Sequence, residues 1–78
     1  MKIFKIREEF ITLGQFLKAT DHINSGGEAK FFLFENDVFV NQEKRTERGK
    51  KLRNGDKVLV ENQEYLIVDD TKTDSQKL

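Results

Sequence analysis

Apolar residues recur at helical spacing in two stretches of the first half of the chain. In the first stretch, Leu13, Phe16 and Leu17 fall at positions i, i+3 and i+4, so one face of a helix would carry all three. Thr12 and Gln15 match a capping box, in which both side chains satisfy backbone N–H groups of the first turn. The pattern predicts a helix that begins at Thr12 and ends near residue 20 or 21.

A second helix is predicted to begin at Ser25, which forms a second capping box with Glu28. Asn36 follows the apolar stripe of this helix, and asparagine tolerates the left-handed conformation in which helices commonly end. We therefore expect a left-handed helix end at Asn36 and a helix–turn–helix-like pair. The apolar stripe consists of Ala29, Phe32 and Leu33.

Beyond the second helix the apolar period shortens to two residues, which is typical of strands. Val38 and Val40 share one face and Phe39 lies on the other, while Asn54-Gly55-Asp56 is a strong turn signal. We expect the charged segment 45–52 to be extended, with a bend or bulge at Gly49. The predicted strands and turns are Lys2–Ile6, Val38–Val40, the turn 41–43, the segment 45–52, Lys57–Val60, the reversal 61–64 and the strand 65–68.

These elements predict an α+β fold, in which two helices pack against a small, mainly antiparallel sheet in the order β-α-α-β-β-β. With 78 residues and no internal repeat, the chain has room for one domain and one core. We expect this domain to span residues 1–68 and to be a monomer. Residues 69–78 are polar and aperiodic, and we expect a flexible tail there.

The chain has 14 basic and 14 acidic residues, but these charges are unevenly distributed. Residues 44–57 hold seven lysines and arginines and only two acids, Glu47 and Asp56, so this window has a net charge of +5 and the remainder −5. A phosphate backbone responds to such a local patch rather than to the average charge. The window is typical of an RNA-binding face, although a solvated, charge-rich loop would have the same composition.

The composition gives no support to several other classes of function. There is no cysteine for a disulfide or a thiolate metal site, and no apolar run approaches the ~20 residues of a membrane span. Because the start of the chain is not a secretory signal, we expect a cytoplasmic protein. No nucleophile–His–acid arrangement, phosphate loop or metal-ligand spacing is found, so we expect no catalytic residue, metal, cofactor or small-molecule substrate. We expect the single histidine, His22, and the acidic pairs Glu8-Glu9 and Asp69-Asp70 to lie on the surface.

Three stretches of the sequence together resemble a known RNA-binding module. They are Ser25-Gly26-Gly27-Glu28-Ala29-Lys30-Phe31-Phe32-Leu33, Val38-Phe39-Val40-Asn41 and Leu52-Arg53-Asn54-Gly55-Asp56-Lys57-Val58. In this order they are similar to the alpha-L RNA-binding motif, the domain type of ribosomal small-subunit protein four, over roughly residues 12–60. The stretch Arg48-Gly49-Lys50-Lys51-Leu52 also resembles a stand-alone bacterial subgroup, the YaaA-like proteins. The resemblance implies that the chain recognises structured RNA, with ribosomal RNA or the ribosome as the partner class.

Two patches of one RNA-binding surface follow from this resemblance and from the charges. One is the start of the second helix, where backbone N–H groups favour phosphate and Lys30 lies alongside, unless Glu28 already occupies those donors. The other is the basic segment, residues 45–53, whose alternative interpretation is a solvated strand edge protected by charge. Gly26 stands where the family has an arginine, so the basic segment would carry more of the binding. The expected RNA-binding residues are Ser25, Gly26, Gly27, Lys30, Asn41, Lys44, Arg45, Arg48, Lys50, Lys51 and Arg53.

Phe31 and Phe34 occupy positions that are usually polar or basic in that family. They could stack on unpaired bases, but we expect the strands Lys2–Ile6 and 65–68 to bury them. Gln42 replaces a family glycine at a turn, where glycine adopts left-handed conformations most easily. The missing arginine and the zero net charge would also suit a protein-interaction adaptor that kept the fold without strong RNA binding.

Overall fold

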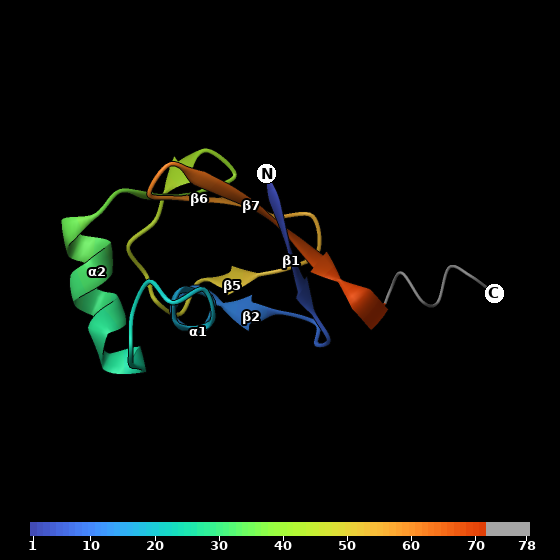
Figure 1. Cartoon of the computed structure of the whole chain (residues 1–78), viewed down its shortest axis with the longest axis horizontal. Coiled ribbons are helices and arrows are strands. Elements are labelled where there is room, and N and C mark those ends of the chain that lie inside the picture. Colours follow the sequence, from blue (N-terminus) through green and yellow to red (C-terminus); the bar gives the residue numbers. More distant parts are fainter. Residues whose placement is uncertain (72–78) are drawn as a thin grey trace.

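A five-stranded sheet and two short helices make up most of the computed structural model, which describes residues 1–71 (Figure 1). The strand order is β1-β7-β6-β3-β4; β1 and β7 are parallel, and the other neighbours are antiparallel. A second sheet of two strands pairs β2 with β5. The elements are β1 (Lys2–Ile6), β2 (Ile11–Thr12), α1 (Leu13–Ala19), a 3₁₀ turn (Gly26–Glu28), α2 (Ala29–Glu35), β3 (Val38–Val40), β4 (Glu43–Lys44), β5 (Lys51–Leu52), β6 (Lys57–Val60) and β7 (Gln63–Asp69). The predicted α+β fold is confirmed, with three short strands added to the predicted order.

The capping box at the start of α1 is present as predicted. The N–H of Thr12 donates to Gln15 Oε1 at 3.0 Å, and the N–H of Gln15 donates to Thr12 Oγ1 at 3.2 Å. Leu13, Phe16 and Leu17 are fully buried, so the predicted apolar stripe does face the core. The helix therefore follows from local sequence alone, because both its start and its buried face are encoded within one short stretch.

The second helix begins with the 3₁₀ turn Gly26–Glu28 and continues as α2, but its predicted left-handed end was wrong. Asn36 is extended, with φ −124° and ψ 149°. Its backbone N–H and its side-chain Nδ2 both donate to the carbonyl of Phe32, at 2.9 and 3.1 Å. The asparagine ends the helix by bonding its last turn, so no positive φ is needed.

Two hairpin turns contain consecutive residues with positive φ. Asn41 and Gln42 have φ of 52° and 73° between β3 and β4, and Glu61 and Asn62 have φ of 49° and 67° between β6 and β7. Two-residue loops with both φ positive match the right-handed twist of the strands they join. Gln42 thus occupies the left-handed position where glycine would be less strained.

The core lies between the helices and the inner face of the large sheet. Phe16 is at its centre, in edge contact with the rings of Phe4 and Tyr65 at centroid distances of 5.0 and 5.1 Å. The buried apolar residues are Ile6, Leu13, Phe16, Leu17, Ile23, Ala29, Leu33, Val38, Val40, Leu52, Val58, Val60, Tyr65 and Ile67.

His22 lies at the edge of this core, so the expected surface position was wrong. Only 9% of its side chain is exposed, and its Nδ1 lies 2.7 Å from the hydroxyl of Thr20. The ring contacts the edges of Phe32 and Tyr65, and its Nε2 is 3.5 Å from a carboxylate oxygen of Glu61. These contacts give the histidine a packing role.

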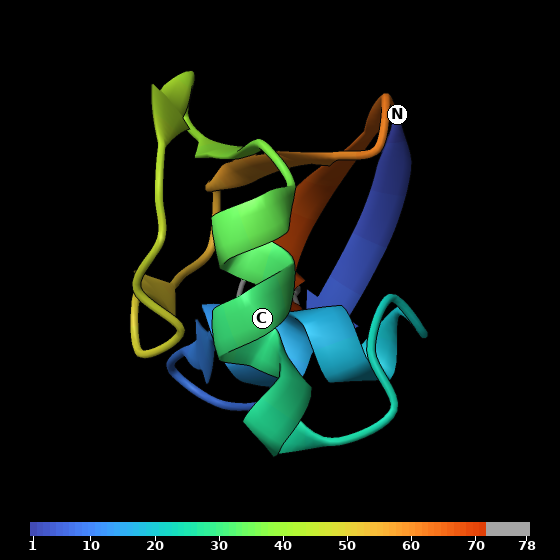
Figure 2. The same ribbon diagram turned by 90° about the vertical axis from the view of Figure 1, so that its left-hand side faces the viewer.

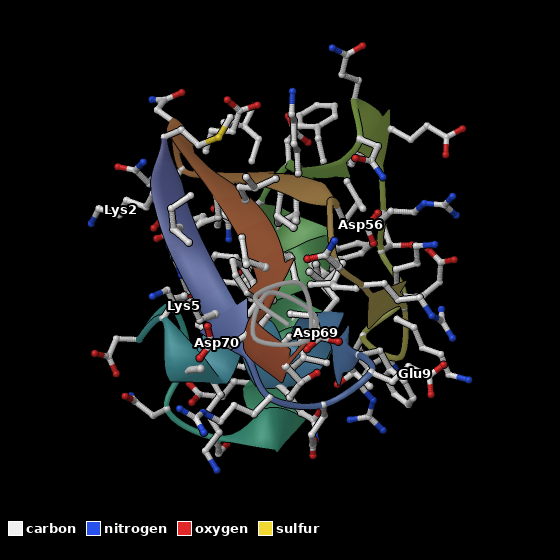
Figure 3. All side chains as sticks on the ribbon, turned by 90° about the vertical axis from the view of Figure 1, so that its right-hand side faces the viewer. Lys2, Lys5, Glu9, Asp56, Asp69 and Asp70 are labelled. Carbon is white, nitrogen blue, oxygen red and sulfur yellow. The ribbon has the colours of Figure 1, made fainter. Side chains whose placement is uncertain are left out.

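The last strand continues to Asp69, one residue beyond the predicted end of the domain (Figure 3). Asp69 is 2% exposed, so the expected solvated position was wrong for this residue. Its N–H donates to Asn54 Oδ1 at 2.8 Å, and its carboxylate accepts a hydrogen bond from the N–H of Thr71. Asp70 is paired with Arg7 at 3.6 Å. The remaining residues of the expected tail, 72–78, lie outside the described residues.

No helix within residues 1–71 is both long and apolar enough to span a bilayer.

Candidate nucleic-acid interface

Two backbone hydrogen bonds hold the basic segment against the first turn of α1. The N–H groups of Leu13 and Gly14 donate to the carbonyls of Lys50 and Arg48, each at 2.8 Å. The first N–H groups of a helix have no partner within the helix, so these carbonyls satisfy two of them. The contact continues into the small sheet, where Thr12 pairs with Lys51. The basic segment is therefore tied to α1 rather than loose in solvent.

This segment is not extended as predicted. It forms a strand only at Lys51–Leu52, and Arg48-Gly49 is a turn in which the N–H of Lys50 donates to the carbonyl of Glu47 at 3.1 Å. The bend predicted at Gly49 is confirmed. The segment lies along the start of α1 as a loop because its carbonyls accept hydrogen bonds from α1 instead of from a neighbouring strand.

Gly14 allows the loop and both helices to meet. A Cβ added to this buried glycine would lie 3.3 Å from the carbonyl oxygen of Arg48 and 3.5 Å from the Cβ of Ala29. Arg48 is therefore next to the start of α2, where the exposed Lys30 follows Ala29. Figure 2 shows the loop running beside α2. The structure brings the two predicted patches together at this point.

Five cations of the predicted set form no ion pair within the part of the chain that the structure describes. Four of them are exposed, and Lys50 is half-buried. These charges remain available to a polyanion. We call this set the basic face: Lys30, Arg48, Lys50, Lys51 and Arg53.

Phe10 is a member of this region that the sequence did not reveal. The Lys51 ammonium lies 4.9 Å from the centre of its ring, and the Arg53 guanidinium lies 5.5 Å from it. Such cation–π contacts fix the two charges side by side without neutralising them. Only the β2–β5 pairing brings Phe10 to these residues, so no local motif could have indicated the contact.

Lys44 and Arg45 do not belong to the basic face, because both form ion pairs within the protein. Lys44 Nζ lies 3.0 Å from Asp37 Oδ1, and Arg45 lies 2.8 Å from Glu43 and 3.4 Å from Glu47. Arg45 Nε is buried without a hydrogen-bond partner. Backbone hydrogen bonds from Glu47 itself and from Thr46, with smaller effects of nearby cations, lower the pKa of the Glu47 carboxyl. The acid therefore stays charged beside Arg45 at neutral pH.

Asn41 has a structural contact for each end of its amide. Its Nδ2 donates to Asp56 Oδ1 and its Oδ1 accepts from the N–H of Lys57, both at 3.0 Å. The other carboxylate oxygen of Asp56 accepts from the N–H of Arg53 at 2.8 Å. The Val-Asn and Gly-Asp motifs therefore contact each other, and they fix the turn from which Arg53 projects.

The carboxylate of Glu28 already binds backbone N–H groups at the start of the second helix. Glu28 Oε1 accepts hydrogen bonds from the N–H groups of Asn24 and Ser25, at 2.8 and 2.9 Å. The N–H of Glu28 donates to the carbonyl of Ser25 at 3.1 Å. Gly26 and Gly27 are exposed, but the Glu28 carboxylate binds the two N–H groups that precede them and would repel a phosphate there. Lys30 is therefore the main contribution of this helix to the basic face.

Phe31 and Phe34 are exposed by 67% and 85%, so their expected burial was wrong. The strands that were expected to cover them, β1 and β7, pair with each other at the sheet edge opposite β4. The two rings remain on the outside of α2.

Residues 1–71 contain no cluster of three or more histidine, aspartate or glutamate side chains that could hold a metal ion.

Comparison with known proteins shows the family to which the chain belongs. The S4 domain family model matches residues 4–68, which extends beyond the resemblance over residues 12–60 at both ends. A Bacillus subtilis (strain 168) protein named probable ribosome maturation protein RlbA is 57% identical over 56 residues, covering 72% of this chain and 79% of that protein. The resemblance to the alpha-L motif and to its YaaA-like subgroup is confirmed. The chain belongs to the S4 domain family, a family of RNA-binding domains.

Proposed function

We propose that this chain binds structured ribosomal RNA through the basic face, as a non-catalytic factor of ribosome maturation in the cytoplasm. The observation that carries the proposal is the docking of the Arg48 and Lys50 carbonyls on the first turn of α1. These two hydrogen bonds fix the backbone from which the side chains of Arg48 and Lys50 project. A chain whose net charge is zero thereby presents a concentrated positive surface.

Recognition would depend on phosphate positions and on the shape of the RNA. Double-stranded RNA is read mainly through its phosphates and 2′-hydroxyls, because its deep major groove excludes side chains. Cations fixed on α2, on the loop and on β5 could contact phosphates on neighbouring parts of one folded RNA. The name of the Bacillus subtilis relative supports ribosome maturation as the process.

Crosslinking the protein to RNA in living cells, followed by sequencing of the attached RNA, tests this function. We expect reads to concentrate at one region of ribosomal RNA and to be lost in the double variant Lys50→Ala/Arg53→Ala. The matched control is Lys2→Ala/Lys5→Ala, which removes the same charge from β1, across the molecule from β5 (Figure 3). Crosslinks without enrichment in ribosomal RNA, or equal loss in both variants, would contradict the proposal.

A further inference from the structure

Phe31 and Phe34 lie three positions apart on the exposed side of α2, beside the loop that carries Arg48. They line a shallow hollow of about 460 Å³ together with Lys30, Glu35 and Thr46. Thr46 belongs to the loop, so the hollow lies between α2 and the loop. Figure 2 shows these two segments side by side. Lys30 is common to the hollow and to the basic face, which makes the two surfaces continuous.

The size of the aromatic patch limits what could cover it. Two phenylalanine rings at these exposures present roughly 300 Å² of apolar surface. A stable protein interface needs about 800 Å² on each partner, with a largely uncharged centre. Here Lys30 and Glu35 border the rings directly. The patch is too small and too closely bordered by charge for a stable protein dimer, but it has the size of one or two nucleobases.

We propose that Phe31 and Phe34 stack on unpaired bases of the RNA that the basic face binds. This inference rests on the proposed function. Every base has a flat π face, so ring stacking recognises unpaired bases with little regard to sequence. Lys30 lies in the first turn of α2 and would contact the adjoining phosphate, whereas Glu35 is the last residue of this helix and would repel phosphate there. The RNA backbone is thereby directed to the start of α2 and the bases to the rings.

An RNA duplex interrupted by a bulge of unpaired bases tests the inference, with 2-aminopurine placed in the bulge as a fluorescent base. The uninterrupted duplex is the second probe. We expect the full-length protein to quench the fluorophore and to prefer the bulged RNA. Phe31→Leu/Phe34→Leu keeps the apolar surface without the rings, and it should lower the affinity for the bulged RNA roughly tenfold while leaving the duplex affinity unchanged. Phe31→Tyr/Phe34→Tyr keeps the rings and should retain both quenching and preference.

Several outcomes would overturn this inference separately from the proposed function. Equal quenching by the leucine variant, with duplex binding intact, leaves RNA binding in place and removes the stacking role. Phe31→Ala/Phe34→Ala could instead lose co-sedimentation with ribosomal subunits while the leucine variant keeps it, which would assign the patch to a protein. A dimer that this alanine variant abolishes would assign it to a second copy of the chain. Failure of the unmodified protein to bind either RNA would contradict the proposed function itself, and the stacking role with it.

Discussion

The backbone N–H of Gly14 donates a 2.8 Å hydrogen bond to the carbonyl oxygen of Arg48, joining α1 to the basic loop. Gly14 is buried, and a Cβ at this position would already lie 3.4 Å from the Cβ of Arg48. The absence of a side chain at one helical residue thus sets the position of a cation more than thirty residues away in the sequence.

Gly14→Val should displace the loop from α1. The additional methyl groups have no space between Arg48 and Ala29, so we expect the free energy of unfolding to fall by about 1–3 kcal/mol. RNA affinity should fall as well, although every cation is retained. Chemical denaturation and RNA titration measure the two effects. Gly49→Ala in the same loop is the control, because an added Cβ there meets nothing within 4 Å and should leave stability nearly unchanged.

Substitution of Asn41 or Asp56 should affect the stability of the fold more than the affinity for RNA. Asn41→Ala and Asp56→Ala each remove hydrogen bonds that fix the turn before β6, and we expect each to lower the free energy of unfolding by about 1–2 kcal/mol. Since both residues share the 3.0 Å bond between Nδ2 and Oδ1, the double variant should lose less than the sum of the single losses. Strictly additive losses in a double-mutant cycle would show that this bond contributes nothing.

Glu47→Gln should strengthen RNA binding. Arg45 would lose one of its two carboxylate partners, so its charge would become more available to phosphate. We expect a several-fold increase in affinity at low salt, and Glu43→Gln provides a second variant with the same direction. An unchanged or weaker affinity in both variants would mean that Arg45 does not reach the RNA.

The lowered pKa of Glu47 makes the stability of the fold depend on pH. Backbone hydrogen bonds in the folded chain lower this pKa below its ordinary 4.5, so the folded state favours the charged carboxylate. Its contribution to stability is therefore present above the pKa of the unfolded chain and is lost as pH falls through the lower folded value. In acid titrations followed by circular dichroism, Glu47→Gln should remove this part of the stability loss. An identical acid transition in both proteins would contradict the assignment.

Phe10→Ala should release the side chains of Lys51 and Arg53. Each cation–π contact of this exposed kind contributes about 0.5–1 kcal/mol, so we expect RNA affinity to fall a few-fold without a change in the salt dependence. Phe10→Tyr keeps the ring and should restore the affinity. A change in the salt dependence itself would show that the two cations had lost phosphate contacts.

Locally encoded features were predictable from the sequence. The capping box of Thr12 and Gln15, the buried stripe of α1 and the Asn54-Gly55-Asp56 turn each depend on residues a few positions apart. The basic loop was mispredicted as extended because its shape depends on N–H groups of α1, which no local pattern reveals.

The wrong predictions for His22 and Phe31 have the same cause, because their exposure depends on residues far away in the sequence. The side chain of His22 is largely covered because Phe32 and Tyr65 of other elements pack against it. Phe31 is exposed because β1 pairs with β7 instead of covering α2. For the candidate interface, the sequence located the cations but not their partners. Only the structure distinguishes the ion-paired Lys44 and Arg45 from the members of the basic face.

The salt dependence of RNA affinity tests the basic face most directly. If its five cations contact phosphates of an RNA hairpin, the slope of log affinity against log salt should be about −4, through counterion release. Lys50→Ala/Arg53→Ala should reduce the magnitude of that slope by about two, whereas Lys2→Ala/Lys5→Ala should leave it unchanged. Thermal unfolding of both variants confirms that each is folded. An affinity and a slope that Lys50→Ala/Arg53→Ala leaves unaltered would contradict the basic face as the RNA-binding surface.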